Sequence, residues 1–351
     1  MKITDREVNV TIALVKKAID PSIEIDNQIL YKVDWAKVLD FTITQGVSGL
    51  CSEAVNKSLN VPRNVLIKWI CNVSQIERNY QCQLKVLQNL TNCLAENNVK
   101  FVVLKGLPLS LYYPVPNHRP FGDIDIYTFG DYDKVNNLME KKGLNINYEE
   151  EKHSVFCFQG IMVENHSTLF DVSHSIIEKY TESLLAINVS NCVLTDSGYY
   201  IPNVFCNYIF LIRHLAKHFG DNEGVILRQI VDFALFLNAN EKFIDAKQIQ
   251  NVLVSTKLIM INDIMVSIAQ DITGFNLNKF IFNEFDIKNK KRVLQDILHT
   301  YRTESKKLGV CRKIQILLEQ RWKYNILPES FYTRLKRAWR NFLINSCVVL
   351  V

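Results

Sequence analysis

The spacing of apolar residues divides the chain into helical and strand-like segments. Apolar positions recur every three or four residues in 6–19 and in the long stretch 63–98, which predicts helices. The same spacing returns in 204–219 and 226–238, and we expect further helices from 245 to 351. From Lys100 the pattern changes to short runs of β-branched and aromatic residues, which favour strands. The chain therefore predicts three regions: helical 1–95, an α+β core at 96–198, and helical 199–351.

The core region alternates predicted strands and helices. Strands are expected at 100–104, 121–129, 153–158 and 161–166, and helices at 107–113 and 130–144. Gln159 and Gly160 join the last two strands and read as a hairpin turn. Asp131 suits the start of the second helix and Gly143 its end. The predicted fold class is thus α+β, with a mixed sheet flanked by helical N- and C-terminal regions.

Composition narrows the class of protein. The 351 residues are 48% hydrophobic and 22% charged, the balance of a soluble globular protein, and the net charge of +5 permits a nucleotide partner. Nine cysteines stand singly without a Cys-x-x-Cys pair, which argues against a structural zinc site and favours a reducing compartment. The charged start "MKITDREVNV" does not resemble a signal peptide, and no apolar run is long enough to span a membrane. We expect a cytoplasmic protein.

Two aspartates interrupt the apolar strand "FGDIDIY". Side chains two apart share one face of a strand, so Asp123 and Asp125 point the same way, roughly 6.6 Å apart along the backbone, while Ile124 and Ile126 face a core. Two such carboxylates suit one Mg²⁺ or a pair of ions. The alternative is a strand end that faces water. Without a cation the like charges repel, so we expect asparagine at both positions to leave stability unchanged or raised in metal-free buffer.

Two further segments could complete an anion and metal site. In "VVLKGLP", Lys105 and Gly106 end a strand and open a helix, where backbone N–H groups can receive a phosphate. The alternative is an ordinary turn with a solvated lysine. In "IMVENH", Glu164 could supply a third carboxylate from a strand beside the aspartates, and His166 shares its face. Asp171 competes for that role, and a polar edge strand is the alternative.

The order "LKG", "YYP", "RPFGDIDIY" and "VENH" resembles a family of uncharacterised bacterial nucleotidyltransferases, within the superfamily related to DNA polymerase β. The resemblance covers residues 100–170, with a fainter continuation to about 235. It implies a nucleotidyltransferase-like fold and transfer of a nucleoside monophosphate from an NTP to an unknown acceptor hydroxyl. The acceptor could belong to a small molecule, a saccharide, a protein or an RNA.

The resemblance also implies roles for individual residues. Asp123, Asp125 and Glu164 would be the catalytic carboxylates that hold Mg²⁺ or Mn²⁺, with Glu164 also a candidate base. The nucleotide would contact four residues: Lys105, Gly106, Ser110 and Arg119. For Arg119 a structural salt bridge is the alternative. The superfamily usually has Gly-Ser or Gly-Gly where this chain has Gly106-Leu107, so the hydroxyl contact to phosphate is missing there. An alternative function is therefore a catalytically weak module on the same fold that binds a nucleotide or a partner.

Outside the core, fewer residues indicate chemistry. His214 and His218 have the i, i+4 spacing of a metal pair, although a structural role or a place in the substrate cleft is the stronger interpretation. Arg228 and Asp232 have the spacing of a helix ion pair. The basic clusters "KNKKR" and "RLKRAWR" suit solvated faces, and the second could touch nucleic acid. Since 1–95 carries no charged constellation, we expect it to set acceptor choice. A chain starting near residue 96, if soluble, should still bind NTP with Mg²⁺.

Overall fold

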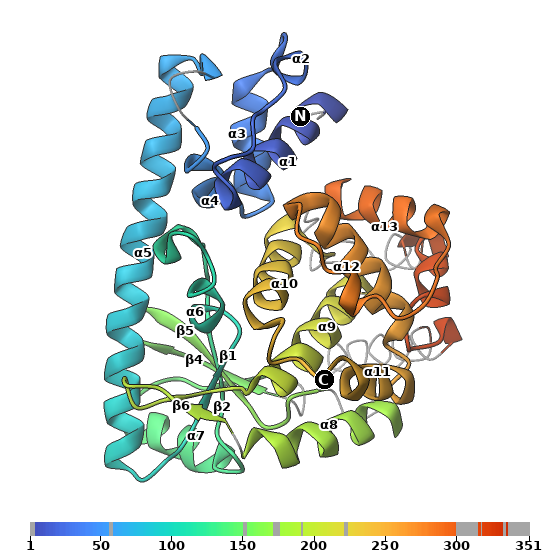
Figure 1. Cartoon of the computed structure of the whole chain (residues 1–351). Coiled ribbons are helices and arrows are strands. Elements are labelled where there is room, and N and C mark those ends of the chain that lie inside the picture. The colour runs from blue at the N-terminus through green and yellow to red at the C-terminus, as the bar shows by residue number, and fades with distance from the viewer. Residues whose placement is uncertain are drawn as a thin grey trace.

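The computed structural model describes residues 4–55, 59–149, 153–170, 176–190, 192–220, 224–299, 315–316, 318–332 and 335. As predicted, the N-terminal region is helical: α1 (Asp5–Ile19), α2 (Asn27–Leu30), α3 (Trp35–Thr44), α4 (Ser48–Ser52) and α5 (Arg63–Glu96). With 34 residues at 1.5 Å each, α5 is about 51 Å long. It runs from the small N-terminal helices down to the sheet along one whole side of the molecule (Figure 1).

The centre of the chain forms a seven-stranded mixed sheet in the order β3-β4-β5-β2-β1-β7-β6. The strands are β1 (Val102–Leu104), β2 (Ile124–Tyr127), β3 (Asn147–Glu149), β4 (His153–Phe158), β5 (Ile161–His166), β6 (Val193–Leu194) and β7 (Tyr200–Ile201). β2 pairs antiparallel with β1 and parallel with β5. This confirms the predicted α+β class with a mixed sheet, and it puts the aspartate strand at the centre.

Short helices connect the central strands: α6 (Leu107–Ser110), η2 (Pro116–His118) and α7 (Tyr132–Lys141). The hairpin prediction is confirmed, since Gln159 and Gly160 link β4 to β5 with φ values of 50° and 85°. Three strands, β3, β6 and β7, were not predicted, because two or three residues are too few to show an alternation of apolar and polar positions. One of them, β7, lies inside the region 199–351 that the sequence assigned to helices.

Helices cover both faces of the sheet and create two hydrophobic cores. Ile124 and Ile126 face a core shared with α5 and α7, as predicted for these two residues. On the opposite face, Val102 and Leu104 belong to a larger core that extends from Val8 in α1 to the C-terminal helices. Residues of all three predicted regions meet in this larger core.

The C-terminal region is helical in its described part. Its helices are α8 (Ile176–Val189), α9 (Val204–Gly220), α10 (Leu227–Asn240), α11 (Ala246–Ser255), α12 (Ile259–Thr273), α13 (Ile287–His299) and the single turns η3 (Asn278–Phe280) and η5 (Arg321–Asn325). Within the described residues, no helix is both long and apolar enough to cross a membrane. The seven described cysteines are free thiols.

The N-terminal helices pack directly on the segment that leads into β2. A Cβ added at Gly49 of α4 would lie 2.1 Å from the carbonyl oxygen of His118, so backbone meets backbone there. The two nitrogens of the His118 ring contact carboxylates, Nδ1 at 2.7 Å from Glu53 and Nε2 at 3.1 Å from Glu77. The N-terminal region therefore contacts the segment around His118, shortly before the two aspartates.

Candidate active site

Strand pairing brings the predicted carboxylates together. Asp125 on β2 stands in register with Glu164 on β5 and with Leu104 on β1. Residues directly opposite one another on paired strands lie on the same face of a sheet, and His166 follows two residues after Glu164 on that face. Asp125, Glu164 and His166 therefore converge on the face opposite Ile124 and Ile126.

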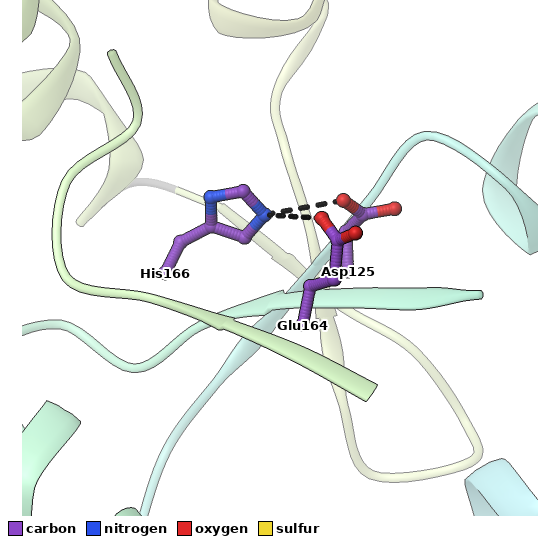
Figure 2. Close-up of side chains that lie close together, drawn as sticks. All are labelled: Asp125, Glu164 and His166. Atoms are coloured by element: carbon purple, nitrogen blue, oxygen red, sulfur yellow. Dashed lines mark hydrogen bonds and ion pairs between the residues drawn. The ribbon is translucent and has the colours of Figure 1, made fainter. Parts of the chain in front are cut away.

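A single histidine nitrogen links the two carboxylates (Figure 2). Nε2 of His166 lies 3.1 Å from Oδ1 of Asp125 and 3.5 Å from Oε2 of Glu164. Oδ1 of Asp125 also receives an ion pair from Nζ of Lys105 at 3.0 Å. Asp125 is only 2% exposed, so its charge is compensated inside the protein by two basic neighbours.

These contacts shift the pKa values in opposite directions. Burial raises the pKa of Asp125, but the charge of Lys105 and the hydrogen bond with His166 outweigh it and hold that pKa well below its ordinary value. The His166 hydrogen bond also lowers the pKa of Glu164 against the effect of burial. Asp123 has a raised pKa because of burial and the negative charge of Asp125. The contacts thus favour the charged form of Asp125 and Glu164, whereas burial and Asp125 disfavour the charged form of Asp123.

The donor set suits a divalent cation. One ligand atom from each of Asp125, Glu164 and His166 lies within 4.8 Å of the other two. Carboxylate oxygens suit Mg²⁺ and Mn²⁺. The predicted trio was Asp123, Asp125 and Glu164, whereas this compact group contains His166 in place of Asp123. Asp123 lies just before β2 and faces the same cavity.

That cavity has a volume of about 750 Å³ and lies between the sheet and the helices. One wall carries the predicted residues Lys105, Gly106, Asp123, Asp125 and Glu164. The other walls come from α9 and α10, with His214, His218, Arg228 and Asp232, and from Ile43, Thr44 and Gly46 at the end of α3. The space is large enough for a small-molecule or cofactor site of ordinary size.

The Lys105-Gly106 turn differs in detail from the prediction. Lys105 and Gly106 both have positive φ, 38° and 57°, and both line the cavity. The helix that follows has only four residues, too short to act as an anion site through its N-terminus. Ser110 is fully buried and its hydroxyl donates to the carbonyl of Leu107 at 2.6 Å. Ser110 is thus turned away from the cavity, and we leave it out of the proposed site.

Arg119 serves the structure through a buried ion pair. Its Nε and Nη2 donate to the two carboxylate oxygens of Asp232 at 2.8 and 2.7 Å, and the hydroxyl of Tyr113 donates to Asp232 at 2.7 Å. This is the salt-bridge alternative for Arg119, although the residue also borders the cavity. Asp232 was expected to pair with Arg228, whose Nη1 instead donates to the carbonyl of Pro120 at 2.6 Å. Both contacts join residues more than 100 positions apart, which local spacing cannot reveal.

The remaining sequence hypotheses have mixed outcomes. The Nε2 atoms of His214 and His218 lie 3.1 Å apart on the cavity wall, in agreement with a place in the cleft. Asp171 and almost all of "RLKRAWR" lie outside the described residues. In "KNKKR", Lys290 pairs with Asp271 at 2.7 Å and Arg292 stacks on Trp322 at 4.2 Å. His166 is the site residue that sequence reasoning left without a role, and its two-residue spacing from Glu164 was the available signal.

Comparison with known proteins gave no match among curated proteins. Solved structures matched over about half of the chain. Two are of the antibiotic-resistance factor ANT(2'')-Ia: a solution structure (10% identity, TM-score 0.36, 50% of this chain and 92% of that chain) and a crystal structure with adenylyl-2''-tobramycin (9%, 0.36, 50% and 97%). A third is an antigenic nucleotidyltransferase-like protein from Paracoccidioides brasiliensis (12%, 0.35, 53% and 91%). At these TM-scores the matches say nothing about substrate.

A family model gives a firmer result. It matches residues 31–274, which is more than half of the chain and well beyond the 100–170 in which the sequence motifs lie. The match includes α3, α4 and α5 of the N-terminal region and continues through α12. The chain belongs to the family of uncharacterised nucleotidyltransferases, and is an enzyme by that membership.

Proposed function

We propose that the protein transfers a nucleoside monophosphate from an NTP to an acceptor hydroxyl, with Mg²⁺ or Mn²⁺ as cofactor. The observation that carries this proposal is the convergence of Asp125, Glu164 and His166 on adjacent central strands, with both carboxylates at the wall of a 750 Å³ cavity. Family membership supplies the reaction class. Buried carboxylates in a cleft, compensated by basic partners, are typical of functional sites.

The proposed roles follow from position and charge. Asp125 and Glu164 would hold the metal. Asp123, which immediately precedes β2, would supply the third carboxylate ligand. His166 keeps the two carboxylates in register with each other by sharing its Nε2 between them. A bound divalent ion would neutralise charge on the triphosphate and on the departing pyrophosphate. The lowered pKa of Glu164 suits a ligand better than a base.

The substrates would share the cavity. Lys105 and the Gly106 turn lie on the wall beside the carboxylates and offer positive charge and backbone to a triphosphate. The acceptor would lie against the residues contributed by α9, α10 and the end of α3. That placement agrees with the expectation that the N-terminal region influences acceptor choice. Small molecules, saccharides, proteins and RNA all remain acceptor classes under this proposal.

Pyrophosphate release tests the proposal against its alternative, the catalytically weak binding module. The full chain is offered each NTP with Mg²⁺ and a cell extract as the source of acceptors. We expect pyrophosphate from the wild type and none from Glu164→Gln, while Glu140→Gln, an exposed carboxylate on α7, behaves as wild type. Mg²⁺ with NTP should also raise the melting temperature, since a ligand of the native state stabilises it. A melting shift without pyrophosphate under any condition would favour the binding module.

A further inference from the structure

Asp123 depends on its backbone for position in a way that Asp125 does not. Asp125 lies within β2 and is fixed by Lys105 and His166. Asp123 precedes the strand, is only partly buried, and its carboxylate forms no ion pair with another described residue. Where Asp123 points is therefore decided by the segment that leads into it, residues 118–122, which we call the entry loop.

Helices from both ends of the chain hold the entry loop at nearly every residue. On the side of α5, Nε2 of Gln83 donates to the carbonyl of Gly122 at 3.2 Å, and Tyr80 stacks on Phe121 with ring centres 5.4 Å apart. On the side of α10, Asp232 binds Arg119, and Nη1 of Arg228 donates to the carbonyl of Pro120 at 2.6 Å. The loop backbone just before Asp123 thus accepts from two side chains outside the loop, Gln83 and Arg228, and the Pro120 carbonyl also accepts from Nη1 of Arg119 at a longer 3.4 Å.

The N-terminal region in turn sets the path of Arg228. Its backbone N–H donates to the carbonyl of Gln45 at 3.1 Å, and the side-chain oxygen of Gln45 accepts from the N–H of Leu227 at 2.8 Å. Gly46 has a φ of 67°, and a Cβ added there would lie 3.2 Å from Cβ and 3.3 Å from Cδ of Arg228. Glycine at 46 suits this backbone conformation, and the absence of a side chain there leaves space for the Arg228 side chain.

We propose that Arg228 and Gln83 are positioning residues of the transfer reaction, which clamp the entry loop from α10 and α5 and so aim Asp123 at the metal. Arg228 touches a loop carbonyl, and Gln83 is buried and is not among the residues that line the cavity. A shared effect of the two residues on metal binding therefore has to pass through the loop. The catalytic part of this inference rests on the proposed function, whereas the clamp itself does not.

The test uses the full chain with Mn²⁺ alone, followed by electron paramagnetic resonance of the free ion, and hydrogen exchange of the peptide covering 119–123. We expect Arg228→Met and Gln83→Leu each to weaken Mn²⁺ binding by about tenfold, the size seen when supports of metal ligands are removed, and to speed exchange in that peptide. Arg228→Lys keeps a donor for the Pro120 carbonyl and should recover most of both properties. Lys217→Met, an exposed residue on α9 with the same charge change, should alter neither.

Other outcomes overturn the clamp. If Arg228→Met and Gln83→Leu leave Mn²⁺ affinity and exchange in 119–123 unchanged, the loop is fixed without them. If Arg228→Met raises only the KM for NTP and Gln83→Leu has no effect, Arg228 binds substrate directly. If the wild type binds Mn²⁺ but turns over no NTP, the transfer reaction fails while the clamp is still judged by exchange and affinity. If the wild type binds no Mn²⁺, exchange alone decides.

Discussion

At the scale of single residues, Asp125 combines a proposed functional role with a structural one. The sequence predicts that both aspartates lower stability without metal, because their like charges repel. The pKa of Asp123 is raised by burial and by the charge of Asp125, in line with such repulsion. Asp125, in contrast, is 2% exposed and its charge is compensated by Lys105 and His166. The two aspartates should therefore respond differently to the same substitution.

We expect Asp125→Asn to destabilise the protein in metal-free buffer by about 1–3 kcal/mol, the usual loss when a buried hydrogen bond to a charged group is broken. Asp123→Asn, which removes a carboxyl that is poorly accommodated as an anion, should leave the free energy of unfolding close to that of wild type. Urea unfolding in the presence of a chelator measures both. Equal stability of the two variants would show that the contacts of Asp125 with Lys105 and His166 do not stabilise the protein.

The sequence could predict which side chains share the site where the alternation of side chains along a strand decides it. The aspartates were found from their two-residue spacing and apolar neighbours, and Glu164 from a strand expected to lie beside them. The structure places all three at one cavity. His166 stands in register with Tyr127, yet its ring reaches Asp125, and only the pairing of β2 with β5 reveals this. Ser110 has a suitable sequence position, but its hydroxyl is used by its own helix. Sequence spacing gives the face of a strand and leaves hydrogen-bond partners open.

At the scale of elements, a buried polar network fixes β5 from behind the proposed site. The side-chain oxygen of Asn136 on α7 accepts hydrogen bonds from Ser154 of β4 at 2.6 Å and from Asn165 of β5 at 3.0 Å. Asn165 lies between Glu164 and His166 and faces the opposite side of the sheet. A one-residue slip of β5 would exchange these faces, so the network specifies the register that the site requires.

Asn136→Ala should lower the free energy of unfolding by roughly 1–3 kcal/mol, because the Ser154 hydroxyl loses its buried acceptor, whereas Asn165 still donates to the carbonyl of Tyr132 at 3.1 Å. Asn137→Ala, the exposed neighbour on the same helix, is the matched control and should change stability little. Denaturant unfolding of the three proteins compares them. A loss no larger than that of the control would mean that β5 is held by its backbone ladder and apolar contacts alone.

At the scale of the whole molecule, the hydrophobic cores do not follow the three predicted regions. Val86, Leu87, Leu90 and Leu94 of α5 pack in the same core as β2, although they lie in the region 1–95. The larger core joins α1 to the C-terminal helices. Periodicity identifies which residues are buried and gives no information on which segment buries them. This is why the sequence predicted the fold class and missed the dependence of the sheet on α5.

From the structure we expect a chain that starts near residue 96 not to fold, which is a separate question from the NTP binding predicted for a soluble fragment. Such a chain lacks α5, which covers one face of the sheet, and lacks the cavity wall formed by Ile43, Thr44 and Gly46. We expect it to be unfolded or aggregated, with no cooperative thermal transition by circular dichroism. A soluble fragment with a cooperative transition and Mg²⁺-dependent NTP binding would instead support an autonomous core.

The contact between Gly49 and the His118 carbonyl constrains how this protein can diverge. With 2.1 Å available, position 49 admits no side chain unless the η2 segment moves, and η2 continues into the entry loop. Sequence changes at position 49 and in the η2 segment should therefore occur together during evolution. Family members that replace the glycine should carry an insertion, a deletion or a different turn ahead of their Gly-Asp-x-Asp motif, and members with this loop should keep it.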